Sequence, residues 1–312
     1  MPWFGGKRRV ANVLWSRFDP TVTNYVEPFA GSLAVLLARP GGAGRWETVN
    51  DLDDMLVNLW RSIKRDPDAV ARHADFPIVE AEYQARRYWI VTEGAARVAA
   101  LVADPDAYDP RVAGYYLHGL ACHIGRNYAD DAGPWQEHEG RWVQRGDPDH
   151  VDDAPGIIRA LPRISWSAGT GVRDLDIRAT MKALADRLRY VRVTSGDFER
   201  VLGPAATTEH GMTAVLLDPP YATQGRQAGL YRHDDGDDVA ARARQWAVDH
   251  GDDPRLRIAL CGYDDVDMPP GWSCHRWTAT GGFGNQSKGR GRANRSREVL
   301  WFSPACLPAP AE

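Results

Sequence analysis

The sequence predicts a doubly wound α/β fold that carries an inserted subdomain. Three observations lead to this prediction: strand and helix patterns alternate near both ends of the chain, a glycine turn joins the first expected strand to a helix, and the alternation is lost between residues 67 and 175. Alternating strands and helices are typical of a largely parallel sheet covered by helices. We therefore expect one sheet domain, formed by residues 1–66 and 175–312, with residues 67–174 inserted into it.

Apolar periodicity and turn residues define the expected elements. Apolar runs bounded by turn residues predict strands at residues 23–27, 46–49, 190–194, 212–217, 257–261, 272–277 and 298–302. Helical spacing of apolar residues predicts helices at residues 33–38, 55–63, 79–103 with an interruption at Gly94, 181–188 and 239–248. The last two strands are expected to form an antiparallel closing hairpin around a basic, glycine-rich loop.

The turn after the first expected strand has the residues of a ligand-binding loop. It reads Pro28-Phe29-Ala30-Gly31-Ser32 and leads into the first helix. A strand, a glycine turn and a helix together direct backbone N–H groups toward a bound ligand. The next strand ends at Asp51, twenty residues after Gly31, where an acid usually holds a ribose. The turn has one glycine where the dinucleotide signature has three, so it is incomplete as a nucleotide signature.

A second motif, Asp218-Pro219-Pro220-Tyr221, directly follows the apolar run at residues 212–217. Ligands of open α/β sheets bind at the carboxyl ends of strands. Because prolines lack N–H groups, carbonyls in such a turn can point outward as acceptors. A carboxylate, a carbonyl and an aromatic ring together suit an amino group on a planar base. The same residue types also form ordinary strand-ending turns, so other motifs have to decide between the two interpretations.

Composition indicates a globular protein without a membrane span. Hydrophobic residues make up 43% of the chain and charged residues 26%, which are globular values. No apolar run approaches the roughly 18 residues that cross a bilayer, and the first residues are not a signal peptide. We expect a soluble, cytoplasmic protein. The four cysteines, at positions 122, 261, 274 and 306, lack C-x-x-C spacing, so neither a metal site nor a disulfide framework is expected.

Charge is unevenly distributed along the chain. The net charge of −4 does not by itself indicate nucleic-acid binding. Residues 281–298, however, carry five basic side chains against a single acid, Glu298. A phosphate backbone responds to the local field rather than to the net charge, so this segment is a candidate DNA contact. A solvated loop would have the same composition.

The insert contains clusters of side chains that can read or wedge bases. They are Arg126-Asn127-Tyr128, Gly133-Pro134-Trp135 and the segment 141–145. Arginine, asparagine, glutamine and aromatic residues make such contacts with base edges and base steps. They also occur in any loop-rich insert, and we expect this one to consist of short helices and loops.

Five motifs in order resemble the Dam-like N6-adenine DNA methyltransferases, which use S-adenosylmethionine. They are Pro2-Trp3-Phe4-Gly5-Gly6-Lys7, Val26-Glu27-Pro28-Phe29-Ala30-Gly31, Asn50-Asp51-Leu52, Gly196-Asp197-Phe198 and Asp218-Pro219-Pro220-Tyr221. The closing segment 282–300 is also similar to that family. The cofactor motif precedes the catalytic one with the insert between them, which is the order of the α group. The resemblance implies a Rossmann-like methyltransferase sheet and a target-recognition role for residues 67–174.

The resemblance also implies a cofactor site for S-adenosylmethionine. The residues carried over to it are Trp3, Gly5, Gly6 and Lys7 as an N-terminal lining, Glu27, Pro28, Phe29 and Gly31 at the methionine end, Asp51 at the ribose, and Asp197 with Phe198 at the adenine. Carboxylates accept hydrogen bonds from hydroxyl and amino donors, and an aromatic ring packs on a heterocycle. The structural alternatives are a helix cap for Asp51 and a core aromatic for Phe198.

The catalytic residues implied by the resemblance are Asp218, Pro219, Pro220 and Tyr221. The Asp218 carboxylate and the Pro219 carbonyl would accept the two N–H groups of a flipped adenine, while Tyr221 would stack on the base. The expected partner is double-stranded DNA, and a cognate restriction endonuclease is a candidate partner. No metal is required. The candidate DNA contacts are Arg126, Asn127, Lys288, Arg290, Arg292, Asn294 and Arg295.

Two departures from the family and three alternatives remain. Leu33 stands where many relatives have a second glycine, and the insert matches the family poorly, so the target sequence cannot be transferred. The two acceptors also suit N4 of cytosine, and a catalytically silent DNA-binding protein could keep the same fold. A nicotinamide-dependent dehydrogenase is disfavoured by the missing glycines and by Asp218-Pro219-Pro220-Tyr221.

Overall fold

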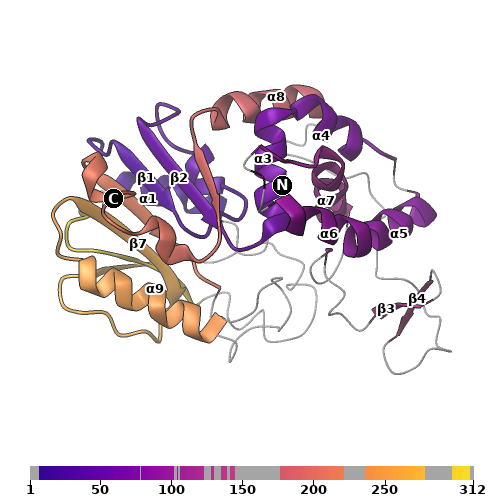
Figure 1. Cartoon of the computed structure of the whole chain (residues 1–312). Helices are drawn as coiled ribbons and strands as arrows, with labels where there is room; N and C mark the ends of the chain where they lie inside the picture. The colour runs from indigo at the N-terminus through magenta and orange to yellow at the C-terminus, as the bar shows by residue number, and fades with distance from the viewer. Residues whose placement is uncertain are drawn as a thin grey trace. The chain divides into compact units, whose positions relative to one another are not determined.

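The structure, a computed structural model of the chain, consists of two compact units (Figure 1). The residues that it describes are 7–77, 79–101, 104, 106–122, 128–129, 135–138, 141–144, 176–220, 236–277 and 297–309. The sheet unit comprises residues 4–52, 190–228 and 233–312, and the helical unit comprises residues 1–3, 53–189 and 229–232.

The sheet unit is built on one open, mixed sheet with the strand order β5-β2-β1-β6-β7-β9-β8. Its strands are β1 (Asn24–Glu27), β2 (Trp46–Asp51), β5 (Arg192–Ser195), β6 (Thr213–Leu217), β7 (Leu256–Tyr263), β8 (Ser273–Arg276) and β9 (Glu298–Phe302). The first five in the spatial order are paired in parallel, whereas β9 runs antiparallel to both β7 and β8. The predicted Rossmann-like α/β sheet with an antiparallel closing hairpin is thereby confirmed.

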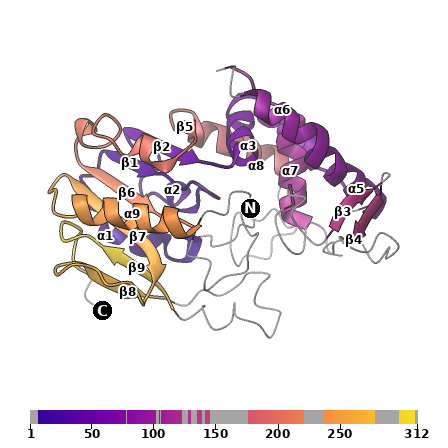
Figure 2. The ribbon, with the colours of Figure 1, turned by 60° about the horizontal axis from the view of Figure 1, so that its bottom comes forward.

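Helices cover both faces of this sheet. The helical elements are η1 (Lys7–Arg9), α1 (Ala11–Arg17), α2 (Ala34–Leu37), the short turns η4 (Phe198–Val201) and η5 (Thr208–His210), and α9 (Gly236–His250). Because neighbouring side chains of a strand point to opposite faces, Tyr25 and Val26 of β1 join different layers. The ring of Tyr25 lies 5.0 Å from that of Trp15 in α1, whereas Val26 packs in a cluster that includes Ala243 of α9. Figure 2 shows α9 lying along one face of the sheet.

The central strand of the sheet, β6, is buried along its whole length. Its apolar sequence, T-A-V-L-L, is what a parallel strand needs when helices cover both of its faces. It pairs in parallel with β1 on one side and β7 on the other. Asp218, the residue that follows β6, is therefore held at the carboxyl edge in the middle of the sheet.

The helical unit packs around α3, whose apolar face is buried as the sequence predicted. Its elements are α3 (Asp54–Arg65), α4 (Pro67–Ala74), α5 (Glu80–Trp89), a π-helical turn η2 (Ile90–Gly94), α6 (Ala95–Ala100), α7 (Pro110–Cys122), α8 (Ile177–Leu188) and the antiparallel hairpin β3 (Trp135–His138) with β4 (Arg141–Gln144). Met55, Leu59 and Trp60 of α3 are at most 1% exposed. Across the described ranges of both units, every helix is too short or too polar to cross a membrane.

The helical unit differs from the sequence expectation in two ways. The 13-residue helix α7 and the hairpin β3–β4 lie where short helices and loops were expected. Since α7 is buried on most sides, it lacks the apolar and polar alternation that marks a surface helix. Gly114 lets α7 approach α4 closely, because a Cβ atom there would lie 2.6 Å from the carbonyl carbon of His73. The unit also includes α3 and α8, so it is wider than residues 67–174, whose recognition role stays a prediction.

Leu33, the departure from the glycine pattern, has the backbone conformation of a glycine. Its φ of 57° lies in the left-handed region, and its side chain is 0% exposed. The left-handed conformation costs a non-glycine residue about 1–2 kcal/mol. Burying a leucine side chain contributes about 1.5–3 kcal/mol. Leucine is therefore tolerated at this position because the apolar interior holds its side chain.

We expect Leu33→Gly to lower the free energy of unfolding by roughly 1–3 kcal/mol, since the cavity cost of truncating a buried leucine exceeds the strain that is relieved. Urea unfolding measures the change. Leu36→Ala, at an equally buried position of α2, is the control without left-handed strain and should lose the larger amount. A Leu33→Gly variant more stable than the wild type would show that the strain outweighs the packing.

Candidate active site

Four acids lie at the carboxyl ends of four adjacent parallel strands. Asp51 and Glu27 are the last residues of β2 and β1, and Asp197 and Asp218 follow β5 and β6. The strands are neighbours in the order β5-β2-β1-β6, so the acids occur along the edge as Asp197, Asp51, Glu27 and Asp218. Because paired strands lie about 4.8 Å apart, the four strand ends span roughly 14 Å. The sequence-predicted acids are thus brought to one edge of one sheet.

Glu27 lies between two other carboxylates of this edge. Its side chain is 4% exposed. Burial raises its pKa to about 8, and the negative charges of Asp218 and Asp51 act in the same direction. The hydroxyl of Tyr25, which donates a hydrogen bond to Oε2 at 3.1 Å, opposes the rise in pKa. Asp218 and Asp51 are therefore near enough to Glu27 for their charges to act on its carboxyl group.

The glycine turn is fastened to the end of β2. The N–H of Gly31 donates to Oδ2 of Asp51 at 3.0 Å, and the N–H of Ala30 donates to the carbonyl of Asn50 at 2.8 Å. Gly31 has a φ of 48°, a conformation that glycine adopts readily. These bonds fix the Asp51 carboxylate against the turn.

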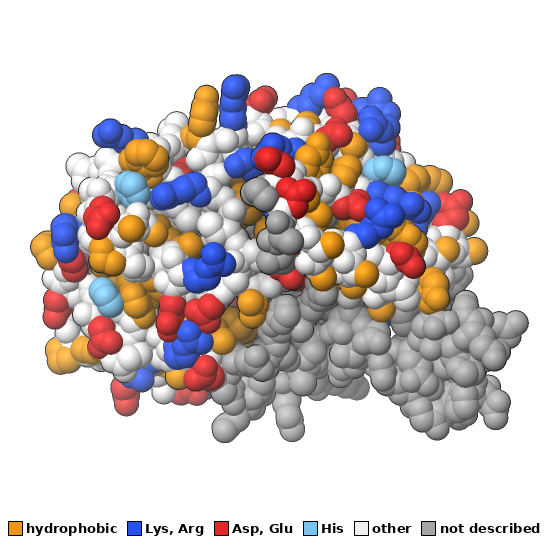
Figure 3. Space-filling model, in the orientation of Figure 1, with side chains coloured by type: hydrophobic (Ala, Val, Ile, Leu, Met, Phe, Trp, Pro, Cys, Tyr) orange, Lys and Arg blue, Asp and Glu red, His pale blue; other side chains and the backbone are white. Residues whose placement is uncertain are grey.

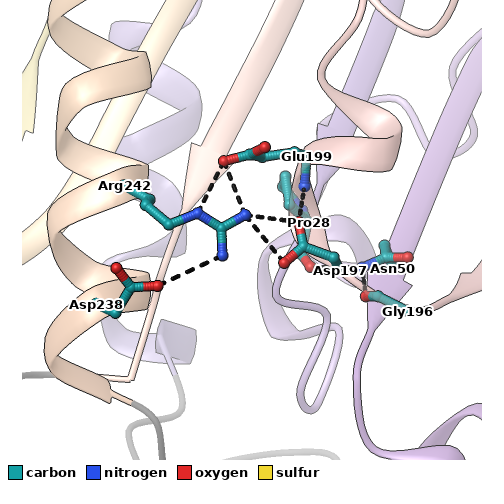
Figure 4. Close-up of polar contacts among 7 residues, drawn as sticks. All are labelled: Pro28, Asn50, Gly196, Asp197, Glu199, Asp238 and Arg242. Carbon is teal, nitrogen blue, oxygen red and sulfur yellow. Dashed lines mark hydrogen bonds and ion pairs between the residues drawn. The ribbon is translucent and has the colours of Figure 1, made fainter.

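Asn50 connects three strand ends and was missed as a site residue by the sequence reasoning. Its Nδ2 donates to the carbonyl of Pro28 at 3.2 Å and to that of Gly196 at 2.8 Å (Figure 4). Its Oδ1 accepts a hydrogen bond from Oγ1 of Thr194 at 2.9 Å. The side chain therefore joins the end of β2 to the segment after β1 and to the end of β5. An amide at a buried strand position was the available signal, because such a group needs partners.

Asp218 is held by a buried lysine. The Nζ of Lys7 lies 2.8 Å from Oδ1 of Asp218, and the two side chains are 4% and 22% exposed. The sequence placed Lys7 only in the lining of the cofactor site, so its pairing with Asp218 is a new contact. Of the adjacent prolines, Pro219 is buried and Pro220 is half-buried.

Two further groups surround Asp218 that the sequence did not assign. The thiol of Cys261 in β7 hydrogen-bonds to Asp218, and burial together with the charge of Asp218 raises the pKa of this thiol well above its usual value. Burial also raises the pKa of Glu298, the first residue of β9, with Lys7 and Asp218 acting in opposite directions. Both residues lie on strands that the sequence expected, but the pairing of β7 with β9 that brings them together was not predicted.

At the other end of the acidic edge, Asp197 is exposed and Phe198 is buried. The Asp197 side chain is 47% exposed and pairs with Arg242 of α9 at 3.1 Å. The ring of Phe198 is 3% exposed and stacks on Phe29 with 5.0 Å between the ring centroids. Phe198 thus lies in the core cluster that packs against α9, and its predicted contact with the adenine of the cofactor stays a prediction.

The remaining predicted site residues lie outside the described residues. They are Trp3, Gly5, Gly6, Tyr221, Arg126, Asn127, Lys288, Arg290, Arg292, Asn294 and Arg295. Within the part of the chain that the structure describes, no cluster of histidine, cysteine, aspartate or glutamate is arranged to hold a metal ion.

The N-terminal part of the chain matches a known family. Residues 3–92 match the model of the D12 class N6 adenine-specific DNA methyltransferases. The matched segment contains β1, the glycine turn, β2 and the helices through α5. This match covers less than a third of the chain and supports the adenine-specific DNA methyltransferase function that the sequence motifs indicated. It ends before Asp197 and Asp218, so the roles of those residues rest on the geometry of the sheet edge.

The raised pKa of Glu27 predicts a pH-dependent stability. An unfolded glutamate titrates near 4.3, whereas folded Glu27 keeps its proton up to about pH 8. Between these values the unfolded state binds fewer protons than the folded state, so stability falls as pH rises toward 8 and then levels off. Glu27→Gln, which keeps an acceptor for Tyr25, should lack this fall. Urea unfolding across pH 5–9 measures it, and parallel curves for both proteins would contradict the assignment.

Proposed function

We propose that this D12 class adenine methyltransferase binds S-adenosylmethionine along its four acids and methylates a flipped adenine beside Asp218. The observation that carries this proposal is the order of the acids on the sheet edge: Asp197, Asp51, Glu27, Asp218. That order matches the sequence of groups from the adenine of the cofactor through its ribose and methionine to the target amine.

The chemistry of these side chains suits the cofactor. The adenine amine, the ribose hydroxyls and the methionine ammonium are all hydrogen-bond donors, and carboxylates are acceptors. The residues that would hold them are Asp197, Asp51 and Glu27, with the glycine turn at Gly31 beside the methionine end. When bound, S-adenosylmethionine supplies a methyl group on a positively charged sulfur, which an edge rich in carboxylates attracts.

Asp218 and Pro219 would activate the target amine. The lone pair of an exocyclic amine is delocalised into the base, so the amine is a poor nucleophile. A carboxylate and a carbonyl that accept its two N–H groups favour a pyramidal nitrogen with an available lone pair. Positive charge develops on this nitrogen during the transfer, so a fixed carboxylate stabilises the transition state more than the ground state.

Lys7 supports this role by fixing the carboxylate. Its ammonium contacts Oδ1 of Asp218 at 2.8 Å in a largely buried position. A charge-assisted hydrogen bond of this kind restricts rotation of the carboxylate. The direction of the second oxygen, Oδ2, is therefore fixed by the same contact. We propose that Lys7 therefore positions the catalytic acid, in addition to its expected place in the cofactor lining.

The substrate is proposed to be double-stranded DNA with one adenine extruded. Flipping a base costs a few kcal/mol, and stacking on Tyr221 would return roughly 1–3 kcal/mol. The basic residues Lys288, Arg290, Arg292 and Arg295 are proposed to contact phosphates, and Arg126, Asn127 and Asn294 are further candidate DNA contacts. A cytoplasmic location and a cognate restriction endonuclease complete the proposal.

The helical unit is proposed to recognise the DNA target. On the face shown in Figure 3, basic and hydrophobic side chains lie side by side over this unit. Within this unit, the guanidinium of Arg111 lies 4.3 Å from the ring of Trp89, and that of Arg97 lies 5.6 Å from the same ring. Arginines held over aromatic rings can contact phosphates or stack on bases.

Asp218→Asn is expected to reduce methyl transfer by about 10²–10³-fold, the usual loss when one fixed transition-state partner is removed. Affinity for S-adenosylmethionine should change little. Transfer of a labelled methyl group measures the rate, and digestion of the DNA to nucleosides identifies N6-methyladenine as the product.

Asp253→Asn is the matched control for this experiment. Asp253 is 21% exposed and ion-paired with Arg255, much like Asp218, but it precedes β7 and so lies at the opposite edge of the sheet. Full activity of the Asp218→Asn variant would refute the catalytic assignment, and methylation at N4 of cytosine would refute the substrate base.

Cofactor binding is expected to release a proton from Glu27. At neutral pH this carboxyl group is mostly protonated, since its pKa is about 8, and a nearby cation favours its charged form. Affinity for S-adenosylmethionine should therefore rise with pH up to about 8. Calorimetry in two buffers of different ionisation enthalpy measures the released proton. Unchanged release in Glu27→Gln would show that another group is responsible.

A further inference from the structure

Arg242 joins α9 to the segment that follows β5. Its Nη2 contacts both carboxylate oxygens of Asp197 at 3.1 Å, and its Nε donates to Oε1 of Glu199 at 3.0 Å. Its Nη1 lies 3.7 Å from Asp238, one turn away on α9. Figure 4 shows this guanidinium between Asp197 and Glu199 on one side and Asp238 of its own helix on the other.

The same arginine lies over the aromatic pair beneath the site. Its Cζ is 5.0 Å from the centroid of the Phe198 ring, and Phe198 stacks in turn on Phe29. A guanidinium is planar, so it can lie over a ring while its edge pairs with carboxylates. Arg242 is therefore restrained by a ring and by acids at the same time.

These contacts leave Asp197 with one available direction. A carboxylate has about four acceptor positions. Oδ1 accepts from the N–H of Glu199 at 2.9 Å and from Arg242, whereas Oδ2 accepts from Arg242. Among the described contacts, Oδ2 thus has the position that is left for a further donor, and the side chain is 47% exposed. The carboxylate is both accessible and fixed in orientation.

We propose that Arg242 is a positioning residue that makes Asp197 selective for the 6-amino group of the cofactor's adenine. This inference rests on the proposed cofactor site. Arg242 fixes the carboxylate so that Oδ2 faces an amine donor. A base with a 6-oxo group would place its acceptor oxygen against the Asp197 carboxylate, which is also an acceptor. A site that is built to accept a hydrogen bond rejects such a base.

If Arg242 only held α9 to the segment of Asp197 and Glu199, it would make the same contacts. The experiment therefore has to distinguish a purely structural role of Arg242 from a positioning role. Exposed ion pairs contribute little to stability, and all three acids around Arg242 are at least 47% exposed. Loss of a purely structural contact would lower the affinity for every ligand of the site alike. Loss of a positioning residue would lower the affinity for the 6-amino ligand and leave the affinity for the 6-oxo ligand nearly unchanged.

The experiment compares two ligands by calorimetry: S-adenosylhomocysteine, and S-inosylhomocysteine, which carries a 6-oxo group. For Arg242→Gln we expect affinity for S-adenosylhomocysteine to fall by about tenfold or more, the cost of one charge-assisted hydrogen bond. Affinity for S-inosylhomocysteine should change by about twofold at most. Arg242→Lys should be intermediate, because a single ammonium cannot hold Asp197 and Glu199 together.

Asp238→Asn is the matched control. Asp238 contacts the other end of the guanidinium at 3.7 Å and is 75% exposed, so its variant should bind both ligands like the wild type. Equal losses for both ligands, or no loss, in Arg242→Gln would overturn the proposal. If Arg242→Gln does not fold, the discrimination ratio of Arg242→Lys decides in the same way. Wild-type protein that is folded but binds neither ligand would instead refute the cofactor site itself.

Discussion

The site depends on the parallel pairing of β5, β2, β1 and β6, because this pairing gathers four acids on one edge of a sheet. Like charges at such spacing repel each other, and the charges of Asp218 and Asp51 add to the burial that mainly raises the pKa of Glu27. The fold offsets the repulsion with specific partners rather than with solvent alone. Lys7 contacts Asp218, Arg242 contacts Asp197, and the Gly31 N–H contacts Asp51. With the Tyr25 hydroxyl donating to Glu27, each of the four acids has its own donor, and each donor also fixes an orientation.

The motifs at strand ends could be predicted from the sequence because they depend on local order. An apolar run followed by Asp218-Pro219-Pro220-Tyr221 places an acid after a buried strand, independently of the order of the strands in the sheet. The same holds for Asp51 after β2. Contacts across large sequence separations could not be predicted in this way. Lys7 and Asp218, or Asn50 and Gly196, meet only through the strand order, and a single sequence does not specify which strands are neighbours.

The helical unit was harder to predict for a different reason. Helix α7 is buried on most sides, so its apolar residues follow no single stripe. Close packing of α7 on α4 depends on Gly114, which is usually a signal against a helix. Conversely, Leu33 occupies a left-handed position that a sequence reader would assign to glycine. In both cases tertiary packing outweighs the local preference of the residue.

The crowding of acids on the sheet edge has a consequence for the order in which substrates assemble. In the proposed site, the negative charge that Lys7, Arg242 and the proton of Glu27 leave uncompensated would repel the phosphates of an approaching duplex, most strongly while no cofactor lies on the edge. A sulfonium compound seated there reduces the negative potential that the duplex meets. If the proposed site is right, binding of the cofactor before DNA would be the electrostatically favoured order, and departure of the neutral thioether product would restore the repulsion and help the modified duplex to dissociate.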